Sequence, residues 1–232
     1  MKLIDAIIDT VYTHNCPICD KVVISEKFCD RCINKIEFIK EETCFKCGLN
    51  VKACDCNIHV YHFDGVVAPY YNEDFAQIMV YRFKFNKRFT CVPILGDIMA
   101  DLAANKFGIE NIDLITFVPM ALVPFRVRGF NQSELLAERI SEKLSIKLDR
   151  DVLKKRNKVK TQHDIKSLGE RFKNVRNAFY YTKNIKGKNV LLVDDIKTSG
   201  ATLDECARQL KFAGANMVYC VTALISNHNK NG

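Results

Sequence analysis

The sequence lacks any apolar run long enough to cross a bilayer. No uninterrupted stretch approaches the roughly 18 residues that a membrane-spanning helix requires. An export signal is also missing, because the amphipathic segment 1–11 has neither a basic flank nor a small-residue cleavage site. We therefore expect a cytoplasmic protein without a transmembrane segment, in which segment 1–11 forms a short surface helix that covers part of a core.

The sequence has no excess of acidic residues. Its 232 residues carry a formal net charge of +8, and basic residues dominate between Asp151 and Val190. A basic segment of this kind attracts polyanions such as diphosphates or nucleic acid, although a solvated surface loop is the alternative. With 48% apolar residues, the chain can form one sizeable domain and a small appendage.

Cysteine is abundant, and eight of the 11 cysteines lie close together near the N-terminus. The eight are Cys16, Cys19, Cys29, Cys32, Cys44, Cys47, Cys54 and Cys56. Short-spaced pairs without an export signal favour metal binding over disulfides, and two pairs form the tetrahedral sulfur site that Zn²⁺ accepts. We predict one or two structural zinc ions. The pairs could be interleaved, His59 or His62 could replace a cysteine in the second site, and an unmetallated arm is the alternative.

Strand and helix patterns alternate after residue 60. The sequence predicts strands over 63–71, 113–119, 188–193 and 217–225, and helices over 73–83, 92–107, 131–144 and 203–212. Alternation of this kind indicates an α/β fold with a mostly parallel sheet flanked by helices. We therefore predict a small cysteine-rich zinc-ribbon domain over residues 1–60 and an α/β domain over residues 61–232.

One stretch of the second domain combines acidic residues with a turn of small residues. The apolar run Leu191–Val193 leads into Asp194 and Asp195, and the turn Thr198–Thr202 precedes a helical pattern. We expect the acidic pair to lie where the strand ends and to accept hydrogen bonds from ribose hydroxyls. The turn and the helix N-terminus would then hold a phosphate. An acidic turn followed by an ordinary helix cap is the alternative.

These residues resemble the ribose-5-phosphate motif of the type I phosphoribosyltransferases. A second motif and the cysteine-rich start are similar to the competence protein F (ComF) family. The second motif comprises Phe117, Val118 and Pro119, then Arg126, Val127, Arg128, Gly129, Phe130, Asn131 and Gln132, then Leu135, Leu136 and Ala137. The chain departs from the family in Ser199, where Thr is commoner, and in the single residue between Cys54 and Cys56.

The resemblance implies a site for phosphoribosyl diphosphate and a role for each motif residue. It implies that Thr198, Ser199, Gly200, Ala201 and Thr202 hold the 5-phosphate, that Asp194 and Asp195 hold the ribose, and that Arg126 and Arg128 hold the diphosphate. It implies that Mg²⁺ is bound mainly through the diphosphate, ribose oxygens and water, and that the N-terminal region is a double zinc ribbon. The basic stretch 154–176 could close over the site as a hood.

Three functions remain open from the sequence. The first is a Mg²⁺-dependent phosphoribosyltransferase with an unknown acceptor. The second, which the ComF resemblance implies, is a factor of natural transformation that handles incoming single-stranded DNA with the competence machinery. The third is an adaptor that binds phosphoribosyl diphosphate without turnover, because the sequence shows no dedicated general base.

Overall fold

The computed structural model describes most of the chain. The described residues are 14–23, 28–54, 56–86, 89–121, 125–126, 129–156 and 168–226. The helix expected over residues 1–11 lies outside them, and so do Arg128 and residues 157–167 of the basic stretch.

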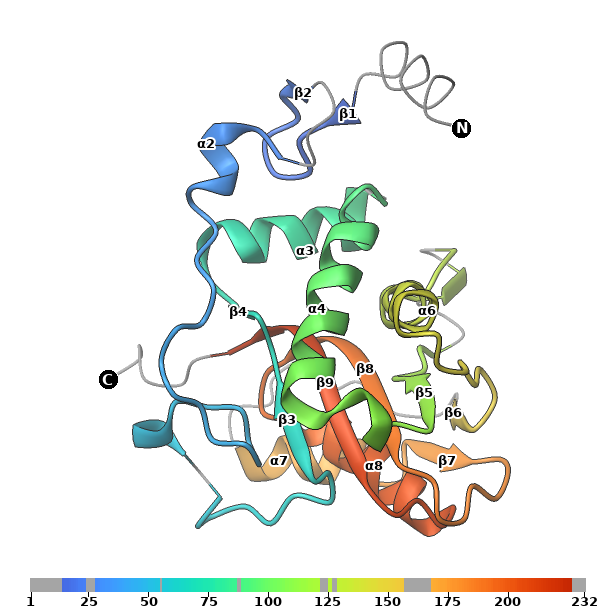
Figure 1. The fold of residues 1–232 in the computed structure, drawn as a ribbon. Coiled ribbons are helices and arrows are strands. Elements are labelled where there is room, and N and C mark those ends of the chain that lie inside the picture. Colours follow the sequence, from blue (N-terminus) through green and yellow to red (C-terminus); the bar gives the residue numbers. More distant parts are fainter. Residues whose placement is uncertain are drawn as a thin grey trace.

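A five-stranded parallel sheet forms the centre of the molecule (Figure 1). Its strands are β3 (Gly65–Val67), β4 (Tyr70–Tyr71), β5 (Leu114–Phe117), β8 (Val190–Lys197) and β9 (Val218–Ile225). Their order is β3-β9-β8-β5, and β4 pairs with β9 beyond the end of β3. All these pairings are parallel, so the predicted α/β class is confirmed.

Helices cover both faces of the sheet, and each face has its own core (Figure 1). One face packs against α3 (Asp74–Asn86), α4 (Cys91–Phe107) and α6 (Gln132–Leu144), and the other packs against α8 (Ala201–Phe212). Residues of β8 alternate between the two cores, as neighbouring residues in a strand point to opposite faces. This burial on both faces explains why the central strands are continuous apolar runs.

The remaining elements are short. They are β1 (His14–Asn15), β2 (Val22–Val23), α2 (Asp30–Ile33), β6 (Leu153–Lys155), α7 (Leu168–Val175), β7 (Phe179–Tyr181) and the 3-10 turns Val51–Ala53 and Ile109–Asn111. Strands β6 and β7 pair antiparallel, and α7 lies between them in the sequence. The basic stretch therefore has regular structure at both of its described ends.

Most predicted elements match the structure closely, but β8 runs four residues further than expected. Its pairing with β9 continues through Asp194↔Thr222 and Ile196↔Leu224 to the pair Lys197↔Ile225. The acidic pair was expected where the strand ends, but it lies inside the strand. The expected strand over 63–71 is divided instead, because Pro69 has no N–H to donate and separates β3 from β4.

The cysteine-rich segment shares both cores of the α/β domain. Cys16 and Cys32 are buried in the core that contains α4, and Cys47 is buried in the core that contains α8. Val66 of β3 donates its backbone N–H to the carbonyl of Phe45. The domain boundary at residue 60 stays a prediction, but apolar packing crosses it.

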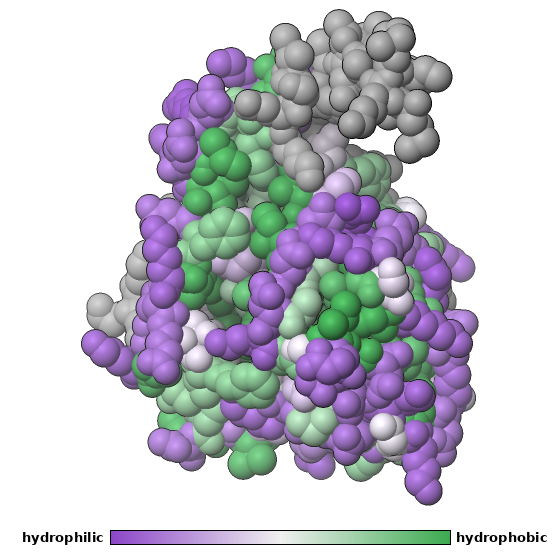
Figure 2. Space-filling model, in the orientation of Figure 1, coloured by the Kyte–Doolittle hydropathy of each residue, from purple (hydrophilic) through white to green (hydrophobic). Residues whose placement is uncertain are grey.

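The face shown in Figure 2 is mostly hydrophilic, with patches of apolar residues between the charged ones. Ile33 and Phe38 are about half exposed, and they line a cavity of about 550 Å³ between α2 and α4. Within the described residues, no helix is both long and apolar enough to pass through a bilayer.

Candidate functional site

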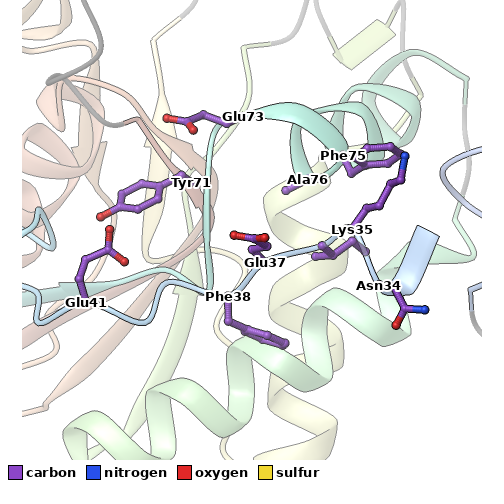
Figure 3. Close-up of a pocket in the computed structure, with 10 residues that line it drawn as sticks. Asn34, Lys35, Glu37, Phe38, Glu41, Tyr71, Glu73, Phe75 and Ala76 are labelled. Atoms are coloured by element: carbon purple, nitrogen blue, oxygen red, sulfur yellow. The ribbon is translucent and has the colours of Figure 1, made fainter. Parts of the chain in front are cut away.

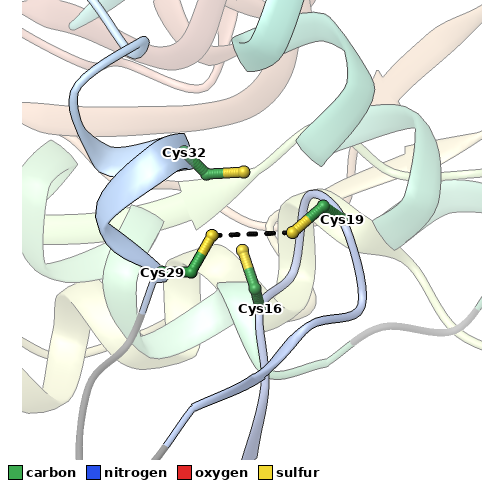
Figure 4. A group of neighbouring side chains, drawn as sticks. All are labelled: Cys16, Cys19, Cys29 and Cys32. Atoms are coloured by element: carbon green, nitrogen blue, oxygen red, sulfur yellow. Dashed lines mark hydrogen bonds between the residues drawn. The ribbon is translucent and has the colours of Figure 1, made fainter.

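The first four cysteines come together in a single group (Figure 4). The Sγ atoms of Cys16, Cys19, Cys29 and Cys32 all lie within 4.8 Å of one another, and those of Cys19 and Cys29 are 3.6 Å apart. Tetrahedral zinc with Zn–S bonds of about 2.3 Å separates its sulfurs by roughly 3.8 Å. This group therefore has the dimensions of a zinc site.

The second group consists of Cys44, Cys47, Cys54 and Cys56 and has similar dimensions. Its Sγ atoms are 3.8 Å apart between Cys44 and Cys56, and 3.7 Å apart between Cys47 and Cys54. The groups are consecutive, so the interleaved pairing is wrong. No histidine is needed, because His59 stacks on Phe172 and His62 pairs with Asp204.

Backbone amides favour the thiolate form of one cysteine in each group. Burial opposes ionisation of Cys16, but nearby backbone N–H groups lower its pKa to about 7. The pKa of Cys44 is lowered to about 7 in the same way, against the effect of burial, whereas burial raises the pKa values of Cys32 and Cys56. Since Zn²⁺ binds thiolate and not thiol, both groups fit the metal that the sequence predicted.

A second candidate site lies where β8 extends beyond its neighbour β5. The pairing of β5 with β8 ends at Phe117↔Val193, whereas β9 continues beside β8. Asp194 and Asp195 follow this point directly, so they lie just beyond the last pair that β8 forms with β5. Crevices at the carboxyl ends of parallel strands are where open α/β sheets bind ligands.

Asp194 is buried and fixed by two hydrogen bonds. Its Oδ1 accepts hydrogen bonds from the Ser133 hydroxyl at 2.8 Å and from the Asp195 backbone N–H at 2.9 Å. Ser133 lies in the first turn of α6, whose N-cap Asn131 accepts a hydrogen bond from the Ser133 N–H. Burial, together with the charge of Asp195, raises the pKa of Asp194 to about 7. A carboxyl group poised in this way can accept or release a proton near neutral pH.

Asp195 has a different partner. Its Oδ2 lies 2.7 Å from the Nζ of Lys84, and the two side chains are 14% and 20% exposed. Lys84 comes from α3, whereas the Ser133 hydroxyl that holds Asp194 comes from α6. The two carboxylates are therefore in unlike environments, although they are adjacent in the sequence.

The turn after β8 leads into the N-terminus of α8. Gly200 is the N-cap residue with φ +80° and provides no side-chain cap, while the Ser199 hydroxyl accepts a hydrogen bond from the Ala201 N–H at 3.4 Å. Thr198 is exposed and Thr202 is half-buried, while the residues between them are buried. Backbone N–H groups in the first turn of a helix have no intrahelical acceptor, so they can bind an anion.

Two buried side chains, Lys197 and Tyr61, pack against one side of this turn. A Cβ atom on Gly200 would lie 3.2 Å from Cε of Lys197 and 3.3 Å from Cε1 of Tyr61. Lys197 is 1% exposed and its Nζ lies 5.9 Å from the centre of the Tyr61 ring. The turn is thus packed on one side, and a buried positive charge lies beside its glycine.

Arg126 is the one predicted diphosphate residue that the structure describes. Arg126 is exposed, and none of its described contacts involves Asp194 or Asp195. Arg128 lies outside the described residues. The roles predicted for both arginines, and for the turn residues, remain predictions.

Two of the larger cavities differ in the charge of the residues that line them. The cavity of about 520 Å³ in Figure 3 is lined by Glu37, Glu41 and Glu73, and Tyr71 points toward Glu41 there. Burial and the neighbouring glutamates raise the pKa of Tyr71 to about 12. Such an acidic cavity repels a phosphate. A cavity of about 690 Å³ beside the acidic pair contains Lys84 and Ile196 instead.

Sequence reasoning missed four residues of the site. Lys84, Ser133, Lys197 and Tyr61 all come from segments far from the acidic pair or from the buried face of β8. Only Lys197 had a local signal, since it stands in the sequence between the acidic pair and the small-residue turn. The other three depend on tertiary contacts that no local pattern reveals.

The comparisons with known proteins agree with this architecture. A family model described as a phosphoribosyl transferase domain matches residues 94–231, and one described as a double zinc ribbon domain matches residues 7–58. The chain is 26% identical over 209 residues to competence protein F of Haemophilus influenzae, covering 88% of this chain and 86% of that protein. The chain belongs to the ComF family.

Other relatives of this ComF chain carry related names. It is 29% identical over 196 residues to competence protein ComFC of Streptococcus pneumoniae, covering 82% of this chain and 84% of that protein. It is 30% identical over 148 residues to DNA utilization protein YhgH of Escherichia coli K12, covering 62% of this chain and 65% of that protein.

Proposed function

We propose that this ComF chain binds phosphoribosyl diphosphate at the carboxyl end of β8 and acts in natural transformation, in the handling of incoming single-stranded DNA. One observation carries the proposal. Asp194 and Asp195 follow the last residue of β8 that pairs with β5, and the N-terminus of α8 begins five residues after Asp195 at Gly200. Sugar hydroxyls and a phosphate could therefore be bound together.

Each group of the ligand has a complementary group in the chain. The acidic pair accepts hydrogen bonds from the ribose hydroxyls, and the first-turn amides of α8 with the hydroxyls of Thr198 and Thr202 hold the 5-phosphate. Arg126 and Arg128 would bind the diphosphate by charge-assisted hydrogen bonds. Mg²⁺, held mainly by the diphosphate and water, would supply counter-charge to the leaving group.

The relatives support the biological part of the proposal. Two of them are named competence proteins and another a DNA utilization protein. The antiparallel pair β6–β7 offers cations and exposed rings to a single strand of nucleic acid, since Arg156 lies 4.9 Å from the centre of the half-exposed Tyr180 ring. Bases stack on such rings while cations contact the phosphates.

Calorimetry with phosphoribosyl diphosphate and Mg²⁺ tests the ligand site. The wild-type chain should bind, and Asp194→Asn should weaken binding at least tenfold at pH 8, where the wild-type carboxyl is ionised. Asp101→Asn removes a carboxylate that is exposed and paired with Lys143 on α6, so it should leave binding unchanged. Absence of wild-type binding, or equal binding by Asp194→Asn, would refute the site.

A second candidate function is turnover, with the cavity beside α3 as the space for an acceptor. That cavity of about 690 Å³ is lined by the exposed rings of Tyr81 and Phe85 as well as by Lys84, whose Nζ contacts Asp195. Planar acceptors stack on such rings. Steady diphosphate release with a nucleobase or an amine would establish a transferase; its absence in a chain that binds the ligand would leave the adaptor function.

A further inference from the structure

Lys84 is the group that balances the charge of the acidic pair. Its Nζ lies 2.7 Å from Asp195 Oδ2, and both side chains are at least four-fifths buried. An ion pair with this geometry and burial is much less screened by solvent than a surface pair. The contact joins α3 to β8, two elements that are far apart in the sequence.

Within the part of the chain that the structure describes, the acidic pair has few other charged neighbours. The groups that face it are Lys84 from α3, the Ser133 hydroxyl from α6, the Cys206 thiol from α8 and the Cys220 thiol from β9, with Lys197 further along β8. Both thiols are buried, and burial raises their pKa values well above the ordinary range. They are therefore neutral, and Lys84 is the cation that contacts the pair directly.

Two adjacent carboxylates without counter-charge have two ways to lower their repulsion. They can hold a proton between them, or they can bind a divalent cation through their oxygens. A resident ammonium group offers a third way, because it offsets one charge and leaves the remaining oxygen lone pairs free. Neutral hydroxyl donors can then use those lone pairs.

We propose that Lys84 is a specificity-determining residue: its charge offsets that of Asp195 and makes the acidic pair unattractive to a bare divalent cation, so that the pair binds the neutral hydroxyls of a sugar. The sugar part of this inference rests on the proposed function. The charge part does not, and it concerns only the contacts of Lys84, Asp194 and Asp195.

The direction of the electrostatic effect supports the inference. Burial and the charge of Asp195 raise the pKa of Asp194, while the positive charge of Lys84 lowers it. Removing Lys84 therefore shifts the ionisation of Asp194 to higher pH. It also leaves Asp195 as an unpaired, largely buried carboxylate, which a divalent cation can bind.

The test compares three variants of the full zinc-loaded chain. Lys84→Met removes the charge and keeps the length, Lys84→Arg keeps the charge, and Lys143→Met breaks a lysine–aspartate pair of 2.6 Å between α6 and α4 as the matched control. Mn²⁺ binding without sugar is followed by electron paramagnetic resonance. Ribose 5-phosphate affinity is measured from pH 6 to pH 9, and the Asp194 carboxyl is titrated by ¹³C NMR.

The Met variant should gain Mn²⁺ affinity at least tenfold, lose ribose 5-phosphate affinity at least tenfold at pH 7, and titrate Asp194 at higher pH. Lys84→Arg should restore much of the wild-type behaviour, and Lys143→Met should match the wild type. If Lys84→Met does not fold, Lys84→Gln replaces it in the same measurements.

Unchanged Mn²⁺ affinity together with an unchanged Asp194 titration would overturn the inference. So would an Arg variant that is indistinguishable from the Met variant. If the wild-type chain does not bind ribose 5-phosphate, the proposed function fails, but the Mn²⁺ and NMR measurements still decide what Lys84 does.

Discussion

At the scale of single residues, the acidic pair shows how identical side chains acquire different properties. Asp194 is buried against the Ser133 hydroxyl, whereas Asp195 contacts Lys84. Burial and the nearby negative charge raise the pKa of Asp194 to about 7. Position in the fold, and not residue type, decides which of the two carboxyls holds a proton at neutral pH.

Asp194 should make the folding free energy depend on pH. The unfolded chain ionises this carboxyl near pH 4, but the folded chain keeps it protonated up to about pH 7. The folded state therefore binds the proton more tightly, and this contribution to stability is lost as pH rises from about 4 to about 7. Asp194→Asn should raise the free energy of unfolding relative to wild type more at pH 8 than at pH 5.

Urea denaturation at both pH values measures this difference. Asp101→Asn, which alters an exposed carboxylate, should show no comparable change between pH 5 and pH 8. Equal effects of Asp194→Asn at both pH values would contradict the assignment of a raised pKa to Asp194.

Gly200 should be sensitive to substitution for two reasons. Alanine at its φ of +80° costs about 1–2 kcal/mol in backbone energy, and the added Cβ would press on Lys197 and Tyr61. Gly187 has φ +76° with no atom within 4 Å of an added Cβ, so it is the matched control. We expect Gly200→Ala to be the more destabilising of the two in urea denaturation. Equal losses would show that the packing under the turn is unimportant.

At the scale of elements, the two zinc ribbons make different connections to the sheet. Phe45, between two cysteines of the second group, packs edge-on against Phe107 and accepts a hydrogen bond from β3 through its carbonyl. In the first ribbon, Asp20 pairs instead with Arg82 of α3. The second ribbon therefore forms a hydrogen bond directly with the sheet, and the first ribbon contacts the sheet through helices.

Substituting a cysteine of the second group should therefore disturb the sheet more than substituting a cysteine of the first group. Cys56→Ser disrupts the second group and should speed amide hydrogen exchange in β3 at least tenfold, because zinc binding contributes to folding. Cys19→Ser disrupts the first group and should leave exchange in β3 near the wild-type rate. Mass spectrometry of peptides spanning 64–68 gives both rates. Similar exchange in β3 for the two variants would show that the ribbons act on the sheet alike.

At the scale of the whole molecule, charge is distributed unevenly. The net charge of +8 coexists with an acidic cavity near residue 37, while the antiparallel pair β6–β7 carries exposed cations. A nucleic acid strand should therefore approach the β6–β7 pair and avoid the acidic cavity. Electrostatic binding of this kind weakens as salt rises, because phosphate contacts release counterions.

Fluorescence anisotropy with a labelled oligothymidine tests this expectation. Affinity should fall with NaCl, and Arg156→Gln should make the log–log slope shallower by about 0.7 for one lost phosphate contact. Lys188→Gln alters an exposed lysine at the opposite, amino end of β8 and should keep the wild-type slope. A flat salt response would exclude an electrostatic single-strand site.

The sequence by itself determined the α/β class, the two groups of four cysteines and the presence of an acidic pair before a small-residue turn. These features are local, because strand periodicity, cysteine spacing and turn residues are written in short segments. Only the tertiary structure decided that β8 continues through Lys197, that Lys84 neutralises Asp195 and that the second ribbon joins the sheet. Those outcomes depend on contacts between distant segments, whose geometry exists only once the chain has folded.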